Sequence, residues 1–69
     1  MKPEEFKLLI ESIGFKFIGN NYYSYKEFRI YLHINYYNFY NGSKVRYSLN
    51  DLTPILKLTR SIKLKNILQ

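Results

Sequence analysis

The chain has 69 residues, no cysteine, and 11 basic against five acidic residues, which gives a net charge of +6. This length predicts a single domain over residues 1–69, and the lack of cysteine excludes a disulfide framework and thiolate metal ligands. With one histidine and five acids, we expect no metal site and no cofactor. No leader-like or long apolar segment is present. We therefore expect no membrane-spanning helix and a cytoplasmic location, which is the host cytoplasm if a phage encodes the chain.

The basic residues are concentrated in the second half of the chain. Residues 1–35 carry five basic and four acidic residues, whereas residues 36–69 carry six basic residues against Asp51 alone. This asymmetry favours a polyanionic partner, such as nucleic acid, an acidic protein surface or an anionic membrane. The alternative is a lysine-rich surface that only keeps a small protein in solution, and both interpretations fit the charge.

Residues 3–13 are predicted to form an amphipathic helix. Pro3 suits the first turn, Glu4 and Glu5 complement the positive end of the helix dipole, and Gly14 is a natural terminator. The apolar residues repeat with a helical period and form one stripe: Phe6, Leu9, Ile10 and Ile13. This stripe should face the core.

After Gly14 the apolar period changes to two, which predicts strands. Two short candidates lie at 15–18 and 22–25, with turn residues between them. The clearest candidate is 28–35, because its even positions are apolar and its odd positions are not. The odd positions are Arg29, Tyr31, His33 and Asn35.

Residues 36–43 are rich in aromatic side chains and end in the turn signal Asn41-Gly42, so we interpret them as a connection. A last strand is predicted at 44–49, with Lys44 and Arg46 on its polar face.

The final predicted element is a helix that begins with Thr53 as N-cap and Pro54 in the first helical position. Its apolar stripe is Ile55, Leu58 and Ile62, and a basic ridge on roughly the opposite side is Lys57, Arg60 and Lys63. Beyond residue 63 the apolar residues move to another face: Leu64, Ile67 and Leu68. Either the helix breaks near Ser61, or its tail docks on something else, and an exposed tail would pair with a partner or with a second copy in a homodimer.

These elements predict an α+β fold in α-β-β-β-α order, with a small antiparallel sheet of three or four strands and both helices on one face. This order and length resemble the double-stranded-RNA-binding domain. That family opens its last helix with a tight basic cluster after a glycine-rich turn. The corresponding stretch here is 50–54, and its first basic residue comes only at Lys57, so the resemblance is one of topology.

The residues offer little for catalysis, and we expect no enzyme and no small-molecule substrate. His33 is the one candidate base for five serines, and none of these serines lies in a nucleophile-elbow motif. The three glycines are isolated and form no phosphate-binding loop.

Two binding hypotheses remain. In the first, the chain binds nucleic acid or a ribonucleoprotein, without membrane contact, through aromatic and basic side chains on two strands together with the helical ridge. The predicted nucleic-acid-binding residues are Arg29, Tyr31, His33, Lys44, Arg46, Lys57, Arg60 and Lys63. Ordinary exposed strand residues would produce the same pattern.

In the second hypothesis, the chain is a protein-directed inhibitor or adaptor. Small, cysteine-free chains rich in Lys, Asn and Tyr resemble products of AT-rich phages and mobile elements, among which counter-defence proteins such as anti-CRISPRs are common. The predicted interface anchors are the aromatic residues of the connection, since tyrosine is enriched at binding hot spots: Tyr36, Tyr37, Phe39 and Tyr40. The alternative for this segment is a loop folded back over the core.

Overall fold

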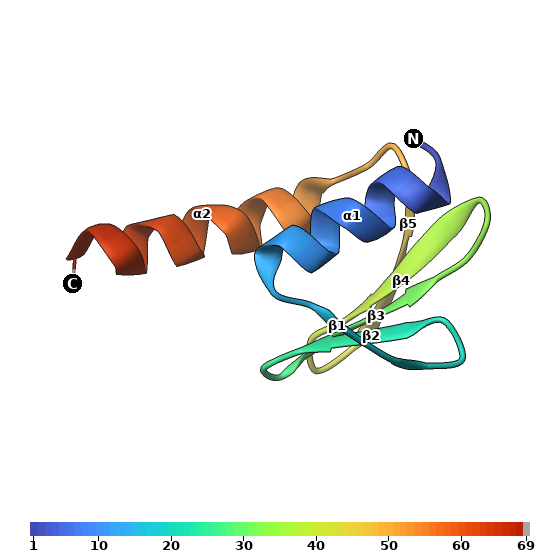
Figure 1. Ribbon diagram of the computed structural model, residues 1–69, viewed down its shortest axis with the longest axis horizontal. Helices are drawn as coiled ribbons and strands as arrows, with labels where there is room; N and C mark the ends of the chain where they lie inside the picture. Colours follow the sequence, from blue (N-terminus) through green and yellow to red (C-terminus); the bar gives the residue numbers. More distant parts are fainter. Residues whose placement is uncertain (69) are drawn as a thin grey trace.

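The computed structural model describes the backbone of residues 1–68 and the side chains of residues 1–61. In chain order the elements are α1 (Pro3–Ile13), β1 (Lys16–Gly19), β2 (Tyr22–Tyr25), β3 (Phe28–Leu32), β4 (Tyr36–Tyr40), β5 (Lys44–Ser48) and α2 (Thr53–Leu68). The five strands form one antiparallel sheet in the order β1-β2-β3-β4-β5, so each strand pairs with its neighbours in the sequence. Both helices lie on the same side of this sheet (Figure 1).

The structure confirms an α+β fold with a small antiparallel sheet but corrects the strand count to five. The extra strand is β4, in the segment predicted to be a connection. Five strands depart from the α-β-β-β-α order on which the resemblance to the double-stranded-RNA-binding domain rested. The predicted strand at 28–35 is also shorter, because β3 ends at Leu32 and the chain turns between His33 and Asn35. This turn is closed by a bond from the His33 amide to the Tyr36 carbonyl (2.8 Å).

Helix α1 follows the pattern predicted for it. Its acidic first turn carries Glu4 and Glu5, and its stripe buries Phe6 and Ile10 completely. Gly14 ends the helix with φ +129° and donates its amide to carbonyls of the last turn. A Cβ at this glycine would lie 2.8 Å from the Tyr25 ring, so glycine is required by both conformation and space.

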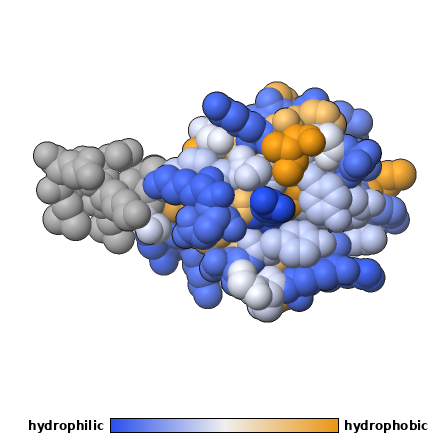
Figure 2. Space-filling view, turned by 90° about the horizontal axis from the view of Figure 1, so that it is seen from below, coloured by the Kyte–Doolittle hydropathy of each residue, from blue (hydrophilic) through white to orange (hydrophobic). Residues whose placement is uncertain are grey.

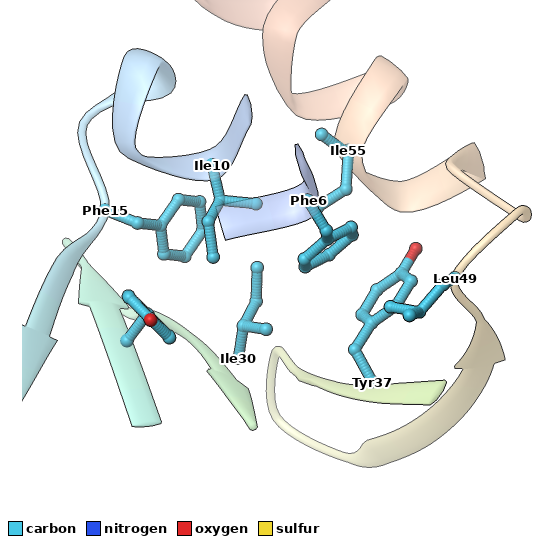
Figure 3. Packing of buried hydrophobic residues seen from close by; sticks show 8 residues of the cluster. Phe6, Ile10, Phe15, Ile30, Tyr37, Leu49 and Ile55 are labelled. Carbon is cyan, nitrogen blue, oxygen red and sulfur yellow. The ribbon is translucent and has the colours of Figure 1, made fainter. Parts of the chain in front are cut away.

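The core lies between the two helices and the inner face of the sheet. Strand alternation directs every second side chain toward the helices. Figure 3 shows Phe6 of α1 between Ile55 of α2 and Tyr37 of β4, and the Phe6 and Tyr37 ring centroids are 4.4 Å apart. The buried core residues are Phe6, Ile10, Phe15, Tyr23, Ile30, Tyr37, Leu49 and Ile55.

Helix α2 begins at the predicted place but with a different cap. The Leu52 carbonyl already accepts the Leu56 amide (2.8 Å), and the Asp51 carboxylate accepts both the amide and the hydroxyl of Thr53 (3.2 and 2.6 Å). These two bonds hold the pKa of Asp51 below its ordinary value. Asp51, and not Thr53, therefore provides the side-chain oxygen at the helix start.

The helix continues from Thr53 to Leu68, so the break considered near Ser61 is absent from the backbone. The side chains of Ile62, Lys63 and the apolar tail at 64–68 lie outside the described residues, and so does the prediction of a homodimer through that tail. Of the helices in the described part of the chain, none combines the length and apolar character needed to cross a membrane.

Candidate nucleic-acid interface

The face of the sheet turned away from the helices, called here the outer face, carries mainly tyrosines and basic residues. Cross-strand pairing arranges them in rows, so that Arg29 of β3 lies opposite Tyr40 of β4, which in turn lies opposite Lys44 of β5. The outer face consists of Lys16, Tyr22, Ser24, Arg29, Tyr31, Tyr36, Asn38, Tyr40, Lys44, Arg46 and Ser48, with His33 just beyond the end of β3.

No acidic residue occurs in any of the five strands. Three of the five acids lie on α1, on the other side of the sheet, and the remaining two are Glu27 in the β2–β3 turn and Asp51 before α2. Among the side chains of residues 1–61, the ion pair found is Lys7–Glu11 on α1 (4.0 Å). The cations of the outer face are therefore not neutralised by carboxylates of residues 1–61. Figure 2 looks onto this face and shows aromatic rings lying among strongly hydrophilic side chains.

Three tyrosines from three adjacent strands form one group, the tyrosine cluster: Tyr22, Tyr31 and Tyr40. The Tyr22 ring centroid lies 4.9 Å from that of Tyr31 and 6.3 Å from that of Tyr40. Interaction with the Tyr40 hydroxyl raises the pKa of Tyr22 above its ordinary value. The three rings thus form one contiguous aromatic group on the outer face.

A second group, the Tyr36 stack, lies beside this cluster. The His33 and Tyr36 rings are nearly parallel, with centroids 4.5 Å apart and 16° between their planes. The Arg46 guanidinium carbon lies 4.3 Å from the Tyr36 centroid, which is cation–π distance. Tyr36 therefore contacts both a histidine and an arginine at the surface.

Asn38 lies between the two groups on the central part of the outer face. Its partners across the strands are Tyr31 and Arg46, and its side chain is 4% exposed. The Asn38 Oδ1 is buried and accepts no hydrogen bond from the residues that the structure describes, and the same is true of His33 Nδ1. These two atoms are the buried side-chain polar atoms found without a partner in residues 1–61, and both belong to the outer face.

Five of the predicted nucleic-acid-binding residues are brought to one face: Arg29, Tyr31, His33, Lys44 and Arg46. The prediction assumed that their two strands pair directly. The structure instead places β4 between β3 and β5, so β4 contributes Tyr36, Asn38 and Tyr40 to the middle of the surface.

The helical ridge is separate from this surface. Lys57 and Arg60 are exposed on α2, which packs on the opposite side of the sheet, and the Lys63 side chain lies outside the described residues. Lys57 borders a cleft of about 400 Å³ between α2 and the inner face of the sheet, where Phe28, Phe39 and Val45 supply apolar walls.

The aromatic residues predicted as interface anchors divide between the two faces of β4. Tyr37 is fully buried in the core and does not fit the predicted role of an exposed anchor, whereas Phe39 is half-buried on the inner face and borders the cleft beside α2. Tyr36 and Tyr40 lie half-buried on the outer face. The prediction of a loop was wrong. Both faces of β4 carry aromatic side chains, so the segment lacks the alternation of apolar and polar residues that indicates a strand.

Sequence reasoning missed Lys16, Tyr22 and Asn38 as members of the surface. The sequence of β2 shows that Tyr22 and Ser24 share one face of the strand and that Tyr23 and Tyr25 share the other. Because both faces carry tyrosine, this alternation could not show which face is buried. Asn38 gave no signal, since asparagine is uncommon inside strands.

The described residues contain no group of three or more His, Asp or Glu side chains placed to hold a metal ion. Comparison with protein-family models, curated protein sequences and solved structures finds no match to this chain.

Proposed function

We propose that this protein binds single-stranded nucleic acid, free or within a ribonucleoprotein, through the outer face of its sheet and without catalysing a reaction. The observation that carries the proposal is that basic side chains free of carboxylate partners among residues 1–61 alternate with tyrosine rings on one sheet face.

The basic residues supply the electrostatic part of such binding. Arg29, Lys44 and Arg46 are exposed, and Lys16 extends the same face to β1 at the sheet edge. Each phosphate neutralised by such a residue releases condensed counterions, which is the main source of affinity that does not depend on sequence.

The tyrosines supply the part that favours single strands. Base–aromatic stacking contributes about 1–3 kcal/mol per base, but only when the base is not already stacked inside a duplex. Tyr31 and Tyr36 are half-buried, so their rings are held by neighbours and still partly open to solvent. A duplex would use the charges of this face and leave the rings unused.

The protein-directed alternative is less well supported by the same surface. Of its four predicted anchors, Tyr37 is fully buried, and Phe39 lies half-buried on the other face of the sheet. The remaining anchors, Tyr36 and Tyr40, lie among cations, so a protein partner would need an acidic face of matching shape.

The experiment compares two double variants with equal charge. Arg29→Glu with Lys44→Glu changes the outer face, and Lys57→Glu with Arg60→Glu changes α2. Each pair removes two positive charges and adds two negative ones, which lowers the net charge from +6 to +2. All four side chains are exposed, so both variants should fold, which circular dichroism can check.

Binding is measured by fluorescence anisotropy with labelled single-stranded oligonucleotides of about 12 nucleotides and with a duplex of the same length. The outer-face variant should lose at least about tenfold in affinity for the single strand, whereas the helix variant should stay within about threefold. Equal losses in both variants would mean that net charge alone drives binding. In the other possible outcome, the unchanged protein binds no oligonucleotide but retains a protein partner from cell lysate after nuclease treatment. That result would replace the proposal by the protein-directed alternative.

A further inference from the structure

We infer that the free edge of strand β5 binds an acidic peptide, which adds to the sheet as a further, antiparallel strand beside Lys44–Ser48. This inference goes beyond the proposed function and does not rest on it. Three features of the edge carry it: backbone groups without a partner strand, an apolar cleft beside them, and positive charge without acidic residues in the strand.

The backbone of β5 directs hydrogen-bonding groups out of the sheet. The bond from the His33 amide to the Tyr36 carbonyl shows that the even-numbered residues of β4 bond to β3, so its odd-numbered residues bond to β5. Their partners on β5 are its odd-numbered residues, so the amides and carbonyls of Lys44 and Arg46 point away from β4. No segment of residues 1–68 pairs with that side of β5.

The two edges of the sheet differ in how they are protected. Natural sheets protect an edge strand from further pairing by a bulge, a proline or short length. Strand β1, at one edge, has four residues and a register shift between Phe17 and Gly19. Strand β5, at the other edge, has five residues and no proline, and its register with β4 is regular throughout. A further strand can therefore pair along the whole of β5.

The charges of β5 disfavour a second copy of this chain as that strand. An antiparallel pair of β5 strands that matches all five residues places Arg46 opposite the same arginine of the copy. Like charges directly opposite each other destabilise a strand pair, whereas opposite charges stabilise it. The partner residues that lie opposite Lys44 and Arg46 should therefore be Asp or Glu.

The inner side of the same edge is apolar. Val45 lies on the inner face, and 44% of it is exposed, with no strand of residues 1–68 on its outer side. It borders the cleft of about 400 Å³ beside α2, whose apolar walls also include Phe39 and Leu58. The partner residue opposite Val45 should be apolar, since it would lie at this cleft. Successive residues of a strand alternate between faces, so the peptide should alternate apolar and acidic residues.

The test measures binding of the full-length chain to a fluorescein-labelled peptide of about eight residues that alternates valine and glutamate. Fluorescence anisotropy gives the affinity. A peptide with lysine in place of each glutamate should bind at least about tenfold more weakly. If the two peptides bind equally, or the glutamate peptide does not bind, the inference is wrong.

Two N-methylated forms of the glutamate peptide separate strand addition from attraction between charges. In an antiparallel strand, the glutamates opposite Lys44 and Arg46 direct their amides toward β5, and the valines direct theirs away. Methylation of the glutamate amides should therefore lower the affinity at least about tenfold relative to methylation of the valine amides. Both peptides carry the same charge. Equal affinities, or weaker binding of the valine-methylated peptide, would overturn the inference.

A pair of protein variants tests the edge from the other side. Arg46→Pro removes an amide that points away from β4, so the bonds within the sheet should remain, and Arg46→Ala removes the same charge but keeps the amide. The proline variant should bind the glutamate peptide at least about fivefold more weakly than the alanine variant. Circular dichroism checks the fold of both, and the methylated peptides decide the question if proline prevents folding.

Equal affinity of the two folded variants would contradict strand addition at β5. The proposed function is judged separately, because these assays contain no nucleic acid and the oligonucleotide titrations contain no peptide. Loss of one therefore leaves the other standing.

Discussion

Tyr37 connects three parts of the molecule through one side chain. Its ring lies 4.4 Å from that of Phe6 on α1 and 5.5 Å from that of Tyr47 on β5. Its hydroxyl donates to the Asp51 carbonyl at 2.5 Å, in the loop before α2. Burial of this side chain raises the pKa of its hydroxyl well above the ordinary value. Tyr37 thus positions the start of α2 relative to the sheet.

Removing the hydroxyl in Tyr37→Phe should lower the free energy of unfolding by about 1 kcal/mol, because one hydrogen bond is lost while the ring packing remains. Urea unfolding followed by circular dichroism measures this change. Tyr31→Phe is the control, since the Tyr31 ring lies on the outer face, and it should change stability by less than about 0.5 kcal/mol. Equal effects of the two substitutions would contradict the role assigned to the Tyr37 hydroxyl.

Asp51 makes the start of α2 sensitive to acid. Its pKa is lowered in the folded protein by the two bonds from Thr53, so the folded state favours the ionised carboxylate. The resulting stabilisation is fully present above the unfolded pKa of about 3.9 and is lost as the pH falls through the lower, folded value.

We therefore expect Asp51→Asn to be less stable than the unchanged protein near neutral pH, with the difference shrinking as the pH falls below about 4. Thermal midpoints measured across that range test this prediction. The other carboxylates are common to both proteins, so their effects cancel in the comparison. A difference that grows toward low pH would show that the sign is wrong.

At the scale of elements, α2 packs against the core through the apolar residues of its first turns. Ile55 is 1% exposed within the core, whereas its neighbour Leu56 is 58% exposed. The two residues have side chains of equal size in the same helical turn, and only one of them is buried.

Ile55→Ala should lower the free energy of unfolding by about 2–5 kcal/mol, because it leaves a cavity between α1, α2 and β4. Leu56→Ala should change it by less than about 0.5 kcal/mol. Chemical denaturation of both variants gives the comparison directly. If Leu56→Ala costs as much as Ile55→Ala, the packing of α2 differs from the one described.

Helices and strands differed in how well the sequence predicted them. Helix α1 was predictable because Phe6 and Ile10 lie on one stripe between Pro3 and Gly14, and these local signals agree with the tertiary contacts. Strand β4 was not predictable from the sequence. Tyr36 and Tyr40 on one face are as aromatic as Tyr37 and Phe39 on the other, so hydrophobicity alone could not distinguish the outer face from the inner one.

At the scale of the whole molecule, the sheet separates the cations of the outer face from the carboxylates of α1. Glu4, Glu5 and Glu11 lie on the helical side, while Lys16, Arg29, Lys44 and Arg46 share the outer face. The helices also carry basic residues, but the outer face is positive and has no carboxylate in its strands, so it can orient the molecule toward a polyanion before contact.

If these four cations each neutralise one phosphate of a single strand, the logarithm of the association constant should fall with the logarithm of salt concentration with a slope near −2.8, from about −0.7 per contact. Titrations at several salt concentrations measure the slope. In Arg29→Glu with Lys44→Glu it should approach about −1.4. An unchanged slope in that variant would place the phosphate contacts elsewhere.

The site was predictable in its chemistry more than in its geometry. Arg29, Tyr31 and His33 follow from the alternation of one strand, and Lys44 and Arg46 from another. Asn38 lies between these residues because β4 is inserted between β3 and β5. This pairing of strands cannot be predicted from a short segment of the sequence.

The order of the strands in the sheet equals their order in the chain. Every pairing closes only a short hairpin, so the sheet can zip up progressively with little loop-closure entropy at each step. The contact between Ile55 and Phe6 spans a much longer stretch of the chain, because it joins α2 to α1. We expect rapid refolding, within milliseconds, in which docking of the last helix completes the native state.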